Sequence, residues 1–187
     1  MSAQGAPEGG GAGSASGRLE KTIALVGMMG VGKSTVGRKL AESLSAPFVD
    51  SDEEIEKAAG LSVQEIFERH GEPEFRRGER RVIERLVNGP PIVLATGGGA
   101  FMDEATRALL KEKATTVWLR AELDVIWKRV SRRDTRPLLK RENPKQVLAD
   151  LAAARAPVYA EADIVVESGD APAGEAVKAI REKLGFR

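Results

Sequence analysis

The chain has 187 residues, of which 42% are hydrophobic and none is cysteine, so it can bury one sizeable core but cannot form disulfides or thiolate metal sites. With 29 basic and 28 acidic residues its formal net charge is +1. With this charge, the overall electrostatic field does not favour binding to nucleic acid or to an anionic membrane, and we expect neither as a partner. Recognition of anions must come from particular Lys and Arg residues.

We expect residues 1–19 to form a disordered tail and residues 20–187 to form a single domain. Residues 1–17 consist almost entirely of Gly, Ala, Ser, Pro and Gln, and such a segment has too few large apolar groups to offset the entropy of ordering. The segment has neither an apolar core nor a basic start, which argues against a secretory signal. We therefore expect a cytoplasmic protein.

Beyond the tail, short apolar runs alternate with longer segments of helical period. The runs predict strands at residues 22–26, 47–50, 92–95, 114–119 and 163–166. The other segments predict helices at residues 33–45, 53–59, 63–70, 74–88, 103–112, 122–130, 144–155 and 173–184, the seventh with Asn143 as its N-cap. This alternation indicates an α/β fold with a parallel sheet covered by helices on both faces, whose ligands bind at the carboxyl ends of the strands.

The segment GMMGVGKS at residues 27–34 follows the first predicted strand and opens the first predicted helix. In this setting successive backbone amides can surround a polyphosphate, Lys33 can bridge phosphate oxygens, and the Ser34 hydroxyl can bind Mg²⁺. A glycine-rich turn without a ligand is the alternative, but Lys33 and Ser34 would add little to its packing. The residues expected to contact a nucleoside triphosphate are Gly30, Val31, Gly32, Lys33, Ser34 and Thr35.

Asp50 and Asp52 come at the end of the second predicted strand, two residues apart, so both carboxylates can point toward the phosphates. One can hold Mg²⁺ directly or through water, and the other can orient an attacking hydroxyl and accept its proton. Alternatively, Asp52 caps the helix expected from Glu53. The position of the pair favours the functional interpretation.

Gly97, Gly98 and Gly99 follow the third predicted strand. A turn seldom needs three glycines, so we expect a ligand to approach this backbone closely and to accept hydrogen bonds from its amides. Of the adjacent residues Arg76 and Arg77, only one can face a site, because neighbouring helical residues diverge by about a quarter turn.

The segment from Arg129 to Arg141 is rich in basic residues. Nucleic-acid binding is one interpretation, but the segment contains no interleaved aromatic residues. A lid at about residues 131–142 that closes over ATP and excludes water fits better.

Six segments together resemble shikimate kinase from about residue 20 to the C-terminus. They are GMMGVGKST at 27–35, DSD at 50–52, EFRR at 74–77, TGGGA at 96–100, TRPLL at 135–139 and RAPVY at 155–159. The resemblance implies a three-layer P-loop fold of the nucleoside-monophosphate-kinase type, with a five-stranded parallel sheet and a lid. It also implies ATP-dependent phosphorylation of the 3-hydroxyl of shikimate. We expect the protein to be a monomer.

On the nucleotide side, the resemblance assigns Lys33 and Ser34 to the phosphates and Mg²⁺, and Asp50 to the surroundings of the metal. Arg136 in the lid would contact the phosphates and the transferred group. Arg129 would pack against adenine.

On the acceptor side, the resemblance makes Asp52 the ligand of the substrate hydroxyls and the general base. Arg76 and Arg155 would bind the shikimate carboxylate, and amides around Gly98 and Gly99 would contact its hydroxyls. A small polyhydroxylated acid offers little apolar area, so its orientation must come from such charge-assisted hydrogen bonds.

Three other functions compete with this interpretation. A kinase of the same fold that acts on gluconate is the nearest, because gluconate is also an anionic polyol. A GTPase is disfavoured because the chain has no NKxD motif. A non-enzymatic protein that only binds ATP would be expected to lack the two carboxylates, which are present.

Overall fold

The structure of the chain is a computed structural model, which describes residues 19–132 and 142–186. Residues 1–18 of the expected tail lie outside the described residues, as do Arg136 and most of the expected lid. Leu19, at the end of the expected tail, is buried in the core.

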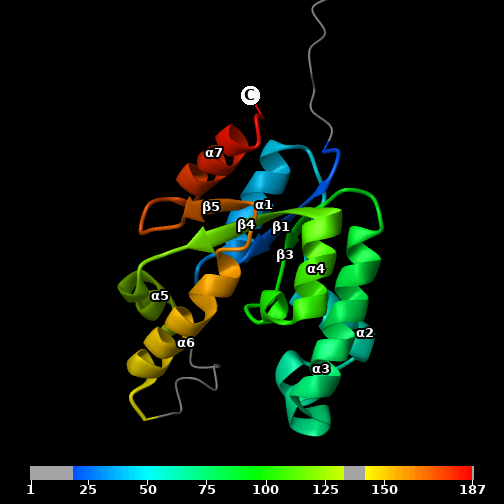
Figure 1. The fold of residues 1–187 in the computed structure, drawn as a ribbon, viewed down its shortest axis with the longest axis vertical. Helices are drawn as coiled ribbons and strands as arrows, with labels where there is room; N and C mark the ends of the chain where they lie inside the picture. The colour runs from blue at the N-terminus through cyan, green and yellow to red at the C-terminus, as the bar shows by residue number, and fades with distance from the viewer. Residues whose placement is uncertain (1–18, 133–141, 187) are drawn as a thin grey trace, which may run out of the picture.

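Five parallel strands form one sheet in the order β2-β3-β1-β4-β5 (Figure 1). They are β1 (Thr22–Val26), β2 (Phe48–Asp50), β3 (Val93–Ala95), β4 (Ala114–Arg120) and β5 (Ile164–Glu167). The α/β class and all five predicted strands are confirmed, the strands to within one residue at each end. The strand order reverses between β1 and β3, which places a ligand-binding crevice at their carboxyl ends.

Helices cover both faces of the sheet, as expected. They are α1 (Lys33–Ser43), α2 (Ser51–Ala59), α3 (Val63–Val87), α4 (Glu104–Lys113), α5 (Leu123–Val130), α6 (Pro144–Tyr159) and α7 (Ala173–Lys183), with a short 3₁₀ turn η1 (Ala100–Met102). Helices α1 and α7 pack on one face, and α3, α4, α5 and α6 lie toward the other (Figure 1). None of these helices, within the described ranges, has both the length and the hydrophobicity needed to cross a bilayer.

Strand β1 explains why two cores form. Ile23 and Leu25 pack into the cluster that contains α1 and α7, whereas Ala24 and Val26 pack into the cluster on the opposite face. All four residues are buried, because the strand is central and its side chains alternate between two covered faces.

The helices expected at 63–70 and 74–88 are both present in α3, where Gly71, whose φ of 76° and ψ of 170° are not helical, separates them. Other predicted helix boundaries were wrong. Helix α6 extends past its expected end to Tyr159, with Pro157 inside it. Asn143 precedes Pro144 as expected, but it is left-handed and its side chain makes no capping hydrogen bond.

Candidate active site

A cleft of about 1440 Å³ opens at the carboxyl ends of the strands. Nearly every residue that the sequence singles out within the described ranges lines it. These are Gly30, Gly32, Lys33, Ser34, Thr35, Asp50, Asp52, Arg76, Gly97, Gly98, Gly99, Arg129 and Arg155. Val31 does not line the cleft because its side chain is fully buried in the core.

The loop after β1 wraps closely around the start of α1. Gly32 occupies the N-cap with φ 100° and ψ 24°, a left-handed conformation that glycine adopts without a steric cost. The Lys33 ammonium lies back over the loop and donates to the carbonyls of Gly27, at 2.7 Å, and Met28, at 2.9 Å. The loop is therefore folded in the form that a P-loop needs, with the lysine beside the helix N-terminus.

The Val31 carbonyl of this loop accepts two hydrogen bonds from distant parts of the chain. Arg129 Nη1 on α5 donates to it at 3.1 Å, and Ser168 Oγ after β5 donates at 2.8 Å. Arg129 Nη2 also donates to the Gly169 carbonyl at 2.5 Å. Arg129 thus joins the P-loop to the segment that follows β5.

Asp50 and Ser34 face each other beside the P-loop. Ser34 Oγ donates to Asp50 Oδ2 at 2.6 Å, and the other carboxylate oxygen of Asp50 accepts from the Asp52 amide at 3.0 Å. The second bond makes Asp50 the N-cap of α2, which begins at Ser51. The suggestion that Asp52 caps a helix starting at Glu53 was therefore wrong, and the Asp52 side chain is left for another role.

Two carboxylates converge on the loop after β3. Asp52 Oδ1 and Glu79 Oε1 are buried and have no hydrogen-bond partner in the described part of the chain. A β-carbon at Gly97 would lie 2.8 Å from the first oxygen and 2.9 Å from the second. Glycine at this position thus lets both carboxylates reach the loop.

Burial raises the pKa of both carboxyl groups. For Asp52 the Asp50 carboxylate raises the pKa further, while Lys33 opposes the effect. For Glu79 the Arg76 guanidinium opposes the effect of burial. A carboxylate held at a raised pKa beside phosphate-binding groups is typical of a catalytic site and is a stronger base than an exposed one.

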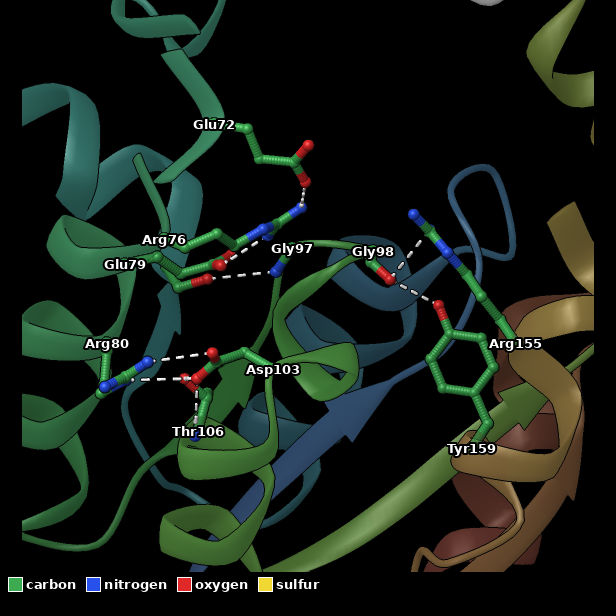
Figure 2. Close-up of polar contacts among 11 residues, drawn as sticks. Glu72, Arg76, Glu79, Arg80, Gly97, Gly98, Asp103, Thr106, Arg155 and Tyr159 are labelled. Atoms are coloured by element: carbon green, nitrogen blue, oxygen red, sulfur yellow. Dashed lines mark hydrogen bonds and ion pairs between the residues drawn. The ribbon is translucent and has the colours of Figure 1, made fainter. Parts of the chain in front are cut away.

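Arg76 faces the cleft and Arg77 does not, as the helical geometry predicted. The Arg76 side chain is 21% exposed and that of Arg77 is 66% exposed. Arg76 Nη1 donates to Glu79 Oε2 at 2.6 Å, and its Nη2 lies 3.3 Å from Glu72 Oε1 (Figure 2). Two carboxylates therefore hold the guanidinium over the glycine loop.

Arg155 approaches the same loop from the opposite side, on α6 (Figure 2). Its Nη1 donates to the Gly98 carbonyl at 3.2 Å, and Tyr159 Oη donates to the same oxygen at 2.5 Å. The amide of the preceding residue, Gly97, donates to Ser51 Oγ at 3.2 Å. The glycine loop is thus held by α2 and α6 and flanked by two arginines.

Among the residues in these contacts, Glu72, Glu79 and Ser168 were not identified from the sequence, and Tyr159, in the segment RAPVY at 155–159, was given no role. Glu79 follows Arg76 by three residues and Tyr159 follows Arg155 by four, spacings that put each pair on one helix face. That spacing was a usable signal. No comparable local signal marks Ser168, which reaches the P-loop only through the tertiary fold.

The residues present fit a magnesium ion. Ser34 and Asp50 present oxygen ligands next to the P-loop, which is the chemistry that Mg²⁺ prefers. No cluster of three or more His, Cys, Asp or Glu side chains suited to a metal occurs among the described residues. A site with one or two protein ligands is characteristic of Mg²⁺ bound together with substrate phosphates.

Comparison with known proteins gives a consistent result. Residues 29–185 match the family model described as shikimate kinase. A shikimate kinase of Caulobacter vibrioides is 59% identical over 164 residues, which cover 88% of this chain and 82% of the relative. The structure of a shikimate kinase from Acinetobacter baumannii in complex with shikimate superimposes with a TM-score of 0.83 and 42% identity, over 88% of this chain and 93% of that one.

A gluconokinase from Sinorhizobium meliloti 1021 is more distant. It covers 90% of this chain and 97% of its own, with a TM-score of 0.55 and 18% identity. At that identity the likeness shows a shared fold alone.

Proposed function

The chain belongs to the shikimate kinase family, and from the geometry of its cleft we propose which residues carry out the reaction. It phosphorylates the 3-hydroxyl of shikimate with ATP in the shikimate pathway, giving shikimate 3-phosphate and ADP. The roles below are assigned to the residues of this chain.

The P-loop residues bind the nucleotide phosphates through the amides of Gly30, Val31 and Gly32 and through the side chains of Lys33, Ser34 and Thr35. The N-terminus of α1 adds a partial positive charge at the same place. Arg129, held between the P-loop and Gly169, packs against adenine. Arg136, outside the described residues, contacts the phosphates and the transferred group.

Ser34 and Asp50 hold Mg²⁺ together with the phosphates. When bound, the ion neutralises charge on the phosphate oxygens. The residues of the chain supply the rest: Lys33 stabilises negative charge on the transferred group, and the cleft aligns the two substrates.

Arg76 and Arg155 bind the shikimate carboxylate from opposite sides of the glycine loop. Gly97, Gly98 and Gly99 donate backbone hydrogen bonds to its hydroxyls. This set of donors suits a small, highly polar acid, because each hydrogen bond to a charged group contributes about 1.5–3 kcal/mol net.

Asp52 orients the 3-hydroxyl and accepts its proton as the hydroxyl oxygen attacks the terminal phosphorus of ATP. Its raised pKa strengthens it as a base. No covalent intermediate with the protein is needed, since the acceptor oxygen displaces ADP directly.

One observation supports this assignment more than any other: the phosphate loop and the arginine-flanked glycine loop share one cleft, with Asp52 between them. A coupled ADP-release assay with shikimate and gluconate in parallel tests it. We expect turnover with shikimate to exceed turnover with gluconate by at least about 10²-fold, because a site whose polar groups are placed for one substrate leaves some of them unpaired with another. Equal turnover would contradict the assigned acceptor contacts.

We also propose a cytoplasmic monomer whose partners are ATP and shikimate. A single chain already contributes groups to both sides of the cleft. Sedimentation at several concentrations tests the monomer, and a mass that rises with concentration would contradict it.

A further inference from the structure

Each of the two loops that line the cleft has one carbonyl held by an arginine and a hydroxyl. On the acceptor side the Gly98 carbonyl accepts from Arg155 and Tyr159. On the phosphate side the Val31 carbonyl accepts from Arg129 and Ser168. The arginines have proposed ligand contacts of their own, but the two hydroxyls do not.

Tyr159 is built into the core with its hydroxyl aimed at the loop. Its side chain is 1% exposed, and its ring stacks on Trp118 with centroids 5.8 Å apart. The hydroxyl lies 2.5 Å from the Gly98 oxygen and 4.0 Å from Met28 Sδ. Burial raises the pKa of the phenol, so it remains a neutral donor.

The Gly98 carbonyl controls the direction of the next amide. A trans peptide is planar, so the carbonyl of Gly98 and the N–H of Gly99 point in opposite directions within one plane. A glycine peptide without such a restraint has wide conformational freedom. A donor that holds the Gly98 oxygen therefore fixes the direction in which the Gly99 N–H points.

We propose that Tyr159 is a positioning residue for the acceptor: its hydroxyl fixes the Gly98 peptide, and thereby the Gly99 amide, for shikimate. Arg155 lies one turn earlier on the same face of α6 and also contacts this carbonyl. With Tyr159 holding the oxygen, the Arg155 guanidinium can turn to the substrate carboxylate without releasing the loop. This inference rests on the proposed acceptor role of the glycine loop.

The test is Tyr159→Phe, which removes only the hydroxyl. The KM for shikimate should rise about 3- to 10-fold, the effect of one lost hydrogen bond, while the KM for ATP changes less than about 2-fold. The control is Thr116→Val, which removes another buried hydroxyl away from the cleft; that hydroxyl donates to Asp163 Oδ2 at 2.8 Å and accepts from the Asp163 amide at 2.9 Å. An unchanged shikimate KM in Tyr159→Phe, or an equal rise in both variants, would overturn the proposal.

A second measurement does not depend on a substitution that weakens the core. Tyr159 is the only tyrosine in the chain, so uniform labelling with 3-fluorotyrosine gives a single ¹⁹F resonance. The resonance should shift on saturation with shikimate, and a resonance that does not respond would overturn the proposal. If wild-type protein fails to turn over shikimate at all, the proposed function fails and not merely this inference.

The geometry assigns Ser168 the corresponding role on the phosphate side. Its side chain is 7% exposed, its amide donates to the Arg120 carbonyl at 2.6 Å, and its hydroxyl donates to the Val31 carbonyl at 2.8 Å. The Val31 peptide leads directly into Gly32, the left-handed N-cap of α1. Holding the Val31 oxygen thus fixes the Gly32 amide, which is directed at the phosphates in the proposed function.

Ser168→Ala should give the reverse kinetic pattern. We expect the KM for ATP to rise about 3- to 10-fold and the KM for shikimate to change less than about 2-fold. Tyr159→Phe and Ser168→Ala then serve as controls for each other. Equal effects of Ser168→Ala on both substrates, or no effect on ATP, would remove Ser168 from this role.

Discussion

The two sides of the cleft are built in different ways. The phosphate side is largely one continuous segment, residues 27–35, which supplies backbone amides, an ammonium and a hydroxyl. The acceptor side gathers Asp52 from α2, Arg76 from α3, residues 97–99 from the loop after β3, and Arg155 from α6. The geometry of a continuous site is set by the spacing of residues along the chain, whereas the residues of a dispersed site come together only when the tertiary fold has formed.

The two sides also differ in charge. The P-loop presents donors to an anion. The acceptor side combines two arginines with Asp52 Oδ1 and Glu79 Oε1, two buried oxygens that have no hydrogen-bond partner in the described ranges. Figure 2 shows the two arginines on opposite sides of the glycine loop. Such a surface matches a ligand that brings both hydroxyl donors and a carboxylate.

The largest expected effect is a loss of turnover that leaves nucleotide binding unchanged. Asp52→Asn should lower kcat about 10²-fold or more, because an amide cannot accept the hydroxyl proton. The dissociation constant for ATP, measured by calorimetry, should change less than about 2-fold, since the P-loop is intact.

Glu53→Gln is the matched control, because Glu53 is the next residue and its side chain is 52% exposed. We expect wild-type turnover from it. Near-normal turnover of Asp52→Asn would mean that Asp52 is not the base.

The next effect concerns the acceptor carboxylate. Arg155→Ala should raise the KM for shikimate about 10- to 100-fold, the equivalent of one lost charge-assisted hydrogen bond, with little change in the KM for ATP. Arg85→Ala is the control, since that side chain is 61% exposed and its pair with Glu54 lies on the surface. If the KM for shikimate were unchanged in Arg155→Ala, the residue would not belong to the acceptor site.

A smaller effect is expected from adding one methyl group to the glycine loop. In Gly97→Ala the β-carbon would lie 2.8 Å from Asp52 Oδ1 and 2.9 Å from Glu79 Oε1. Overpacking of this kind should lower the free energy of unfolding by about 1–3 kcal/mol and raise the KM for shikimate.

Gly78→Ala is the matched control for this change. A β-carbon at Gly78 would meet no atom within 4 Å, and alanine favours the interior of helix α3, so stability should rise by about 0.5–1 kcal/mol. Urea denaturation of both variants checks the pair. Equal stability changes of the same sign would show that the loop tolerates a side chain.

Most of the fold could be predicted from the sequence. The strands are short apolar runs, and a buried parallel sheet requires such runs wherever it is covered on both faces. The break within α3 was predictable, because Gly71 and Pro73 are each typical of a helix boundary, and Gly71 has non-helical dihedral angles. Helix α6 was expected to end at residue 155, yet it continues past Pro157, a residue that usually interrupts a helix, to Tyr159, which packs in the core.

The site was predictable to the extent that its residues form local motifs. The P-loop and the glycine run were found because their chemistry depends on adjacent residues. Glu79 and Ser168 were missed because one acts through Arg76 and the other through the Val31 carbonyl. The Arg76–Glu79 pair is local, its members three residues apart on one helix, so its spacing was a usable signal. The contact of Ser168 depends on where the end of β5 is placed, which the local sequence does not encode.

The smallest expected effect is a shift in the pH dependence of kcat. Burial, and next the Asp50 carboxylate, raise the pKa of Asp52, and Glu56 raises it to a lesser extent. Since a protonated Asp52 cannot accept the hydroxyl proton, kcat should fall as the pH drops through this raised pKa. Glu56→Gln removes one negative charge but keeps an oxygen that can accept from the Val63 amide, so the acid midpoint should move to lower pH.

Asp50→Asn should move the same midpoint further, because Asp50 contributes more than Glu56 to the raised pKa. Each profile is scaled to its own maximum, so the loss of turnover expected from a changed metal ligand does not obscure the midpoint. The order of the two shifts tests whether charges on the two sides of the cleft interact, because Asp50 faces Ser34 of the P-loop and Asp52 faces the glycine loop. A midpoint that stays in place in both variants would assign the acid limb to a group other than Asp52.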